Sequence, residues 1–261
     1  MNIYKAESKY IKNNSMVKIF QVISGFVGAF VIIAMSSYYS GKLDIVRFIR
    51  EQYMGFIILA FILPFQYSNY FCSNFETGSI KNIIASGNSR KSFVIAKFLK
   101  QASNVVKCVT WYSIGSIIMF ALKFIFLQNN VTLVNFSFYF IFEMFLKYLM
   151  ICVLIIYFST LILFISMTLK KEMISSLATL FILVANIVTT LRLSQSDDYT
   201  FIKTNLYFYK TIMIMENYHF ADQTFISGIQ NFLAALIVPM ISIIIFLTLS
   251  IVMFQKNDIT I

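Results

Sequence analysis

The side chains that carry most enzyme chemistry are scarce in this sequence of 261 residues. His219 is the single histidine, which leaves no basis for a serine–histidine nucleophile or for a metal site with several imidazole ligands. The three cysteines, Cys72, Cys108 and Cys152, show neither C-x-x-C pairing nor zinc-ligand spacing. We interpret them as reduced thiols in apolar segments, and we expect no catalytic residue and no metal site in this chain.

The sequence also lacks a loop for nucleotide phosphates. A Walker A loop reads G-x-x-x-x-G-K-[ST], so that backbone amides and a lysine hold the phosphates, and none of the eight glycines begins one. The apolar spans carry no acidic residue of the kind that a proton-coupled transporter uses in mid-membrane. We therefore expect that this chain is not an enzyme and holds no cofactor, and that any ATP and Mg²⁺ bind to a partner subunit.

The composition indicates the elements that position the remaining residues. Hydrophobic residues make up 59% of the chain and charged residues 12%, about half the charge of a soluble domain. Apolar stretches long enough to cross a bilayer, which takes roughly 20 helical residues, occur at 17–38, 53–72, 108–127, 148–169, 174–191 and 229–254. The connectors are too short for a separate domain. We predict an all-α membrane protein with six transmembrane helices in one domain, 1–261.

Charge indicates the orientation. With both termini in the cytoplasm, 13 of the 21 basic residues face inward, which favours an N-in, C-in arrangement in a bacterial plasma membrane. The net charge of +10 then reflects topology and attraction to anionic lipid headgroups rather than nucleic-acid binding. The inward set is Lys5, Lys9, Lys12, Lys18, Lys81, Arg90, Lys91, Lys97, Lys100, Lys107, Lys170, Lys171 and Lys256.

Two segments outside the spans have interfacial patterns. Residues 1–16 place Ile3, Tyr4 and Ile11 among lysines, which is typical of an amphipathic helix at the inner interface or of a solvated leader. Residues 199–227 are too polar to span and too apolar for a free loop, so we expect helices at the outer leaflet before the sixth span. Within this outer segment, Phe208 and Met215 are candidate cargo contacts, although a structural lid explains the pattern equally well.

Charged and amide residues near the later spans have two interpretations. Glu143 and Lys147 are spaced i, i+4 with the acid first, which favours an ion pair at headgroup level, one turn outside the apolar block. Buried in mid-span, the same residues would instead indicate a functional site. Asn186 in the fifth span is more consistent with a helix-to-helix hydrogen bond than with a ligand contact.

The loop between the second and third spans has the most specific pattern, SNFETGSIKNIIASGNSRK at 73–91. Asn74 is a candidate cap for a short helix, Gly87 suits a left-handed end, and Ile80, Ile83 and Ile84 fall on one face. Ser89 is a candidate cap for a following helix from Arg90 to Gln101, which leads into the third span. These signals predict a short helix parallel to the membrane on the cytoplasmic side.

This loop resembles the one after the second span in permease subunits of the type-two class of ABC exporters, also called type V. Those permeases carry E-x-G-[ST]-I-[KR] followed by [ST]-R-x-x-x-x-x-K, and this sequence matches at Glu76, Gly78, Ser79, Ile80, Lys81, Ser89, Arg90 and Lys97. The resemblance implies a coupling helix that docks on a cytoplasmic ATPase, an amino-terminal interface helix that helps to clamp it, and outer-leaflet helices before the last span.

We therefore predict the permease of an ATP-driven ABC exporter that pairs with a second identical or related permease and with cytoplasmic ATPase subunits. Few polar side chains and many phenylalanines in the spans favour an amphiphilic or hydrophobic cargo, such as a peptide, an antimicrobial peptide or a lipid. The chain looks similar to permeases of bacteriocin or lantibiotic self-protection and peptide export. The alternative is an ATP-independent membrane immunity protein that sequesters an antimicrobial peptide.

Overall fold

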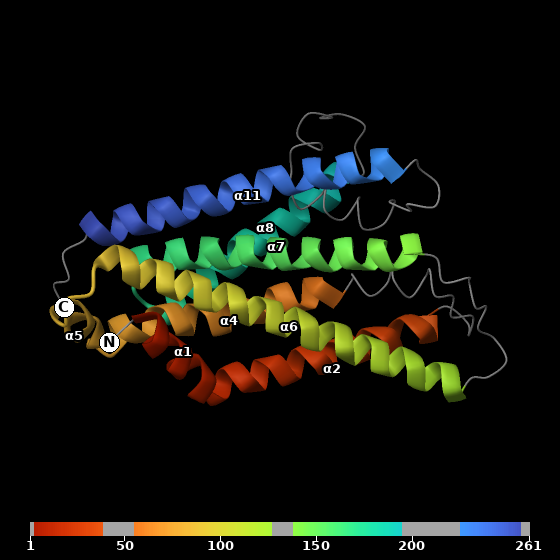
Figure 1. Ribbon diagram of the computed structural model, residues 1–261, viewed down its shortest axis with the longest axis horizontal. Coiled ribbons are helices and arrows are strands. Elements are labelled where there is room, and N and C mark those ends of the chain that lie inside the picture. The colour runs from red at the N-terminus through yellow and green to blue at the C-terminus, as the bar shows by residue number, and fades with distance from the viewer. Residues whose placement is uncertain (1–2, 39–54, 127–137, 195–224, 257–261) are drawn as a thin grey trace.

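The computed structural model describes residues 3–38, 55–126, 138–194 and 225–256 (Figure 1). In these residues every regular element is an α-helix, and no strand is present. The helices within the described ranges are α1 (Ile3–Asn13), α2 (Ser15–Tyr38), α4 (Gly55–Glu76), α5 (Ser79–Ala85), α6 (Arg90–Phe126), α7 (Phe138–Leu169), α8 (Glu172–Ser194) and α11 (Phe225–Lys256).

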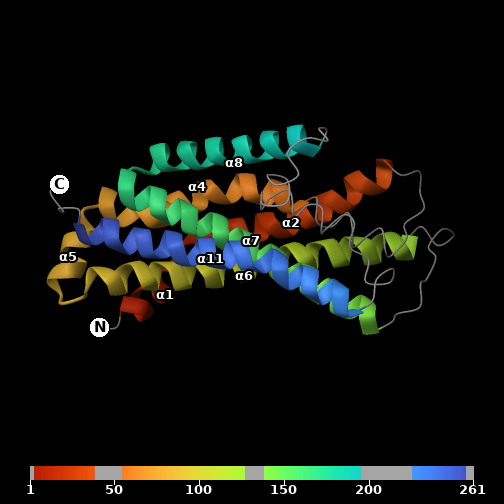
Figure 2. The same cartoon turned by 90° about the horizontal axis from the view of Figure 1, so that it is seen from above.

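The long helices form an elongated bundle with α7 at its centre. This helix packs against α4, α6, α8 and α11, whereas α2 packs mainly on α6 (Figures 1 and 2). The start of α1, the short helix α5 and the end of α11 lie at the same end of the bundle (Figure 1). The residues of the predicted coupling loop are therefore next to both terminal helices.

Glycines allow α2 and α6 to approach closely. A Cβ atom built on Gly28 would lie 2.2 Å from the carbonyl oxygen of Tyr112, and one on Gly115 would lie 2.0 Å from the carbonyl oxygen of Gly25. Small residues of this kind bring helix backbones into direct contact where lipid supplies no hydrophobic driving force between helices. The α2–α6 pair is thus fixed by backbone proximity.

Four of the described helical segments are long and apolar enough to cross a membrane: Ser15–Ala34, Arg90–Leu122, Met144–Leu169 and Leu236–Lys256. The described apolar part of α8, Glu172–Ala185, is shorter than this. All-helical structure and transmembrane helix character are thereby confirmed. Six spans, their orientation and the outer-leaflet helices stay predictions, and residues 199–224 of the outer segment lie outside the described residues.

The bundle exposes large apolar side chains on its outside. Phe26 and Phe30 on α2 are 72% and 62% exposed, and Phe181 on α8 is 76% exposed. Extensive apolar surface of this kind is rare on proteins that meet only water. It is the surface expected of helices that contact lipid or a second membrane subunit.

The structure gives the extent of the helices at the third and fourth predicted spans. The expected helix from Arg90 continues without a break into the third span as α6, and α7 begins at Phe138, with its candidate span starting at Met144. Consequently Lys147 lies inside the candidate span Met144–Leu169 and is only 4% exposed, because central α7 is surrounded by other helices. Lys147 is therefore packed among helices, whereas its depth in the bilayer stays a prediction. The side chains of Glu143 and Asn186 lie outside the described residues.

Candidate functional site

The candidate site is the end of the bundle around α5, where the predicted coupling residues gather. Two glycines in left-handed conformations bound this helix: Gly78 has φ 66° just before it, and Gly87 has φ 86° just after it. Left-handed backbone is costly for residues with a Cβ atom, which explains glycine at both turns. The prediction for Gly87 is confirmed. Asn74, the candidate cap, instead lies inside α4, which continues to Glu76, so that prediction is wrong.

One face of α5 is buried and the other is exposed. Ile80 is completely buried, and Ile83 and Ile84 pack beside it on the main core, as the spacing of the isoleucines predicts. Lys81 and Asn82 are exposed on the outer face, together with Ala85 and Ser86. Burial of Ile80 is worth about 1.5–3 kcal/mol relative to exposure. It holds α5 against the bundle while Lys81 and Asn82 stay exposed on the opposite face.

Glu76 links the end of α4 to the beginning of α8. Its Oε1 atom accepts a hydrogen bond of 2.8 Å from the backbone N–H of Glu172, the first residue of α8. In turn, the Glu172 carboxylate accepts a bond of 2.9 Å from the Asn69 side-chain amide on α4. An acid at a helix N-terminus satisfies an otherwise unpaired N–H and opposes the positive end of the helix dipole. Glu76 therefore caps α8 from a distant part of the chain.

Arg90 links the beginning of α6 to the end of α11. Its Nη1 atom donates hydrogen bonds to the carbonyl oxygens of Gln255 at 2.9 Å and Phe254 at 3.3 Å. A cation at the carbonyl end of a helix is favoured by the helix dipole. The Phe254 ring also packs between Phe75 of α4 and Phe93 of α6, at 5.8 and 5.7 Å between ring centroids. The end of α11 is thus anchored next to α5.

Ser89 begins α6 as the sequence predicts. Its Oγ atom accepts a hydrogen bond of 3.1 Å from the backbone N–H of Ser92, the geometry of an N-cap. The Asn88 side chain closes the preceding turn by donating to the Ile83 carbonyl oxygen at 3.2 Å. These local bonds fix the angle at which α5 leads into α6.

Lys97 links α6 to both α1 and α4. This lysine is completely buried, and its Nζ atom donates a hydrogen bond of 2.6 Å to the Tyr70 carbonyl oxygen and lies 3.8 Å from Oε1 of Glu7. The Tyr70 hydroxyl donates to Oε2 of Glu7 at 2.9 Å. The ammonium group also lies 4.1 Å from the centroid of the Tyr70 ring. The amino-terminal helix is thereby attached to α4 and α6 through a buried charge pair.

The sequence pattern assigns Lys97 to the cytoplasmic side of the membrane, which stays a prediction, and predicts no role for Glu7. In the structure the partners of the Lys97 ammonium group are inside the bundle rather than in water. A signal for Glu7 does exist: it falls between Ile3 and Ile11 at i, i+4 spacing, on the buried side of α1. An acid on the apolar face of an amphipathic helix indicates a buried cation.

The described residues contain no group of three or more histidine, cysteine or acidic side chains able to hold a metal ion. Cys72, Cys108 and Cys152 are free and buried, in agreement with their interpretation as reduced thiols. Phe208 and Met215, the candidate cargo contacts, lie outside the described residues. The contacts described around α5 join this short helix to several long ones.

No protein-family model matches this chain, and no curated protein is significantly similar to it. The resemblance of the 73–91 loop to permease coupling loops consequently stays a prediction. What the structure adds is the placement of the matching residues. Glu76 binds the start of α8, and Arg90 binds the end of α11. Lys97 contacts Glu7 of α1, and Ile80 packs in the core.

Proposed function

We propose that this chain is the permease subunit of an ATP-driven exporter in the bacterial plasma membrane. It pairs with a second identical or related permease and with cytoplasmic ABC ATPase subunits, which bind the ATP and Mg²⁺. The observation that carries the proposal is the set of contacts around α5. A short helix with an exposed polar face is flanked by Glu76 and Arg90, whose side chains bind the ends of two long helices.

These contacts supply a mechanism for coupling. Closure of the ATPase subunits moves the exposed face of α5, and buried Ile80 transmits that movement to the core. Glu76 and Arg90 carry it to α8 and α11, while Lys97 carries it to α1. Packed helices that move as rigid bodies then switch between inward-facing and outward-facing arrangements.

The cargo we propose is amphiphilic or hydrophobic: a peptide, an antimicrobial peptide or a lipid. Support comes from the apolar character of the spans and from the aromatic outer segment, 199–227. Polar replacements at Phe208 and Met215 should lower export or protection while sparing basal ATP hydrolysis by the purified complex. Normal export combined with reduced thermal stability would instead assign these two residues to a structural lid.

The coupling role is tested best on the exposed face of α5. Glu76 is unsuitable for a charge reversal, because Glu76→Lys also removes the cap of α8. We therefore choose the double variant Lys81→Glu/Asn82→Glu, whose two side chains are exposed. The matched control is Lys9→Glu/Asn13→Glu, which makes the same chemical changes on the exposed side of α1.

The experiment purifies each tagged variant from membranes of the native host and measures co-purified ATPase subunit and ATP hydrolysis. Wild type and the α1 control should retain both, and the α5 variant should lose at least about 90% of both, equivalent to roughly 1.4 kcal/mol of binding free energy. Equal ATPase recovery with all three proteins would contradict coupling through α5. Absence of ATPase from every preparation would favour the ATP-independent immunity protein.

A further inference from the structure

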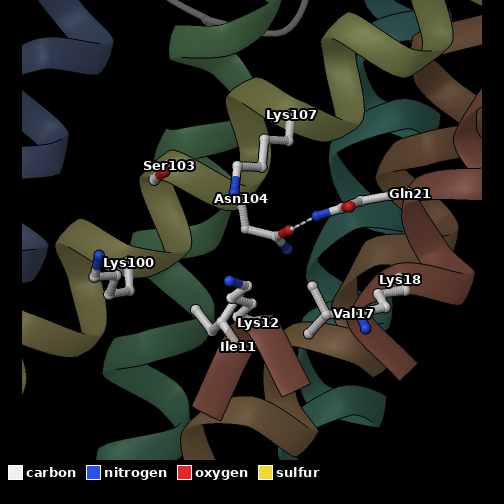
Figure 3. Close-up of a pocket in the computed structure, with 9 residues that line it drawn as sticks. All are labelled: Ile11, Lys12, Val17, Lys18, Gln21, Lys100, Ser103, Asn104 and Lys107. Carbon is white, nitrogen blue, oxygen red and sulfur yellow. Dashed lines mark hydrogen bonds between the residues drawn. The ribbon is translucent and has the colours of Figure 1, made fainter. Parts of the chain in front are cut away.

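A basic pocket lies between α1, α2 and α6, away from the exposed face of α5. Its volume is about 240 Å³, and four lysines line it: Lys12, Lys18, Lys100 and Lys107 (Figure 3). Among the described residues that line the pocket there is no carboxylate. Four cations around a cavity that provides no internal counter-charge favour an anionic ligand.

A buried amide adds a directed donor to this pocket. Asn104, which is 1% exposed, accepts a hydrogen bond of 2.8 Å from Nε2 of Gln21 through its Oδ1 atom. This bond fixes the amide, and the Nδ2 atom of Asn104 is buried without a hydrogen-bond partner among the described residues. Figure 3 shows Asn104 and Lys12 approaching the cavity from different helices. An unpaired buried donor destabilises the folded state, and an acceptor bound in the pocket would offset that cost.

The acidic side chain of α1 is not available to this pocket. Glu7, one turn before Ile11, is held by the Tyr70 hydroxyl and lies beside Lys97. The Nζ atom of Lys100 lies 3.6 Å from the centroid of the Tyr4 ring. A ring face attracts a cation without neutralising it. These contacts bring no acidic side chain into the pocket.

An apolar groove continues from the basic pocket along α2 and α6. It has a volume of about 380 Å³, and its lining includes Val22 and Ala29 on α2 and Trp111 and Leu122 on α6. Trp111 stands four residues after Lys107, so the groove begins one helical turn beyond the pocket. From Trp111 to Leu122 the helix rises about 16 Å, close to half of a roughly 30 Å hydrocarbon core.

We propose that the basic pocket binds the phosphate of an anionic phospholipid and that the apolar groove holds one of its acyl chains. The lysines and the Asn104 amide match the several acceptor oxygens of a phosphate, and the groove has the length of a chain in one leaflet. Free inorganic phosphate would satisfy the pocket alone and would leave the groove unused. This lipid site requires only that the chain lie in a bilayer, so it does not depend on coupling to an ATPase.

The test uses the purified chain in nonionic detergent without any ATPase. The probes are phosphatidylglycerol, phosphatidylcholine and inorganic phosphate, with lipid binding followed by native mass spectrometry and by thermal shift. Lys12→Gln/Lys107→Gln removes two pocket charges, and Lys81→Gln/Lys91→Gln removes two exposed charges at α5 and the start of α6. At about fivefold per lysine, the pocket variant should bind phosphatidylglycerol about 25-fold more weakly, and the control variant should match wild type.

Further variants separate the two parts of the site. Ala29→Leu narrows the groove and should weaken phosphatidylglycerol binding with all lysines present, and Asn104→Ala should weaken it without removing a charge. If a pocket variant has a lower melting temperature than wild type in detergent alone, Lys18→Gln is tested in its place. Lys18 also lines the pocket, and its side chain is exposed. Equal binding of phosphatidylcholine, an equal loss in the α5 control, or a thermal shift by inorganic phosphate that matches the lipid would each overturn the proposal.

Discussion

The carboxylate of Glu76 accepts a hydrogen bond from the backbone N–H of Glu172 across 96 positions of sequence. Glu76, the first residue of the stretch that resembles a permease coupling motif, thus caps the distant helix α8. A side chain at the end of α4 determines how α8 begins, and the short helix α5 starts only three residues after it. Any force on α5 therefore acts close to the junction of two long helices.

Glu76→Lys should destabilise the protein more than Glu76→Gln. Lysine has no acceptor for the Glu172 N–H and places a positive charge at the positive end of the α8 dipole, whereas glutamine retains an acceptor. We expect a loss of about 1–2 kcal/mol for lysine and less than about 1 kcal/mol for glutamine. Thermal unfolding in detergent measures the difference, with Lys81→Glu as an exposed control. Identical melting temperatures for both Glu76 variants would show that the cap is unimportant.

Lys97→Met should cost about 3 kcal/mol or more, because it leaves the buried Glu7 carboxylate without its cation. The double variant Glu7→Gln/Lys97→Met should recover much of that loss, since the remaining Tyr70 hydroxyl still has a neutral acceptor. Denaturation of the two single variants and the double variant gives the coupling energy directly. Additive losses would mean that Glu7 and Lys97 do not stabilise each other.

Three glycine-to-alanine changes at the α2–α6 contact should lower stability in the order of how little space each new Cβ atom has. Gly115→Ala and Gly28→Ala place a Cβ 2.0 and 2.2 Å from backbone oxygens, so the helices must separate, at a cost of about 1–3 kcal/mol. Gly25→Ala is the matched control, because its Cβ would lie 3.4 Å from the nearest atom. Melting temperatures of the purified variants test this order, and an equal effect at Gly25 and Gly28 would contradict it.

The orientation can be tested by thiol labelling of intact cells. In a background with Cys72, Cys108 and Cys152 replaced by alanine, a cysteine at Asn88 should be protected from an impermeant reagent added outside. Cysteines placed at Asn129 or Ser196 should be labelled, because the N-in arrangement puts both outside. Labelling at position 88 in intact cells would reverse the orientation and remove the proposed ATPase contact with it.

Much of the α5 region was predictable because its signals are local. The left-handed turn at Gly87, the cap at Ser89 and the buried face of Ile80 each depend on residues within about one helical turn. Asn74 shows where such reasoning fails. It has the properties of an N-cap, yet α4 continues past it to Glu76 because packing against α7 and α8 supports the longer helix.

The roles of Glu7, Asn104 and Lys147 were not predictable in the same way. Glu7 meets Lys97 across 90 positions and Asn104 meets Gln21 across 83, and composition contains no information about either pair. Lys147 looked interfacial because apolar residues begin directly after it, but its burial depends on the helices that surround α7. A polar side chain in an apolar segment therefore indicates a buried polar contact, but the sequence does not show which residue is its partner.

The sequence by itself determined that this is an all-helical protein with membrane-spanning segments and a short helix bounded by glycines at 78 and 87. Those properties follow from hydrophobicity summed over about 20 residues and from the backbone freedom of single residues, which are local quantities. Tertiary structure decided which charges are buried, which helix each motif residue caps, and where a basic pocket meets an apolar groove. Such relationships depend on residues that helix packing brings together. A hydrogen bond forms only when its two atoms are about 3 Å apart, and the order of residues in the sequence does not fix the positions of the helices that accurately.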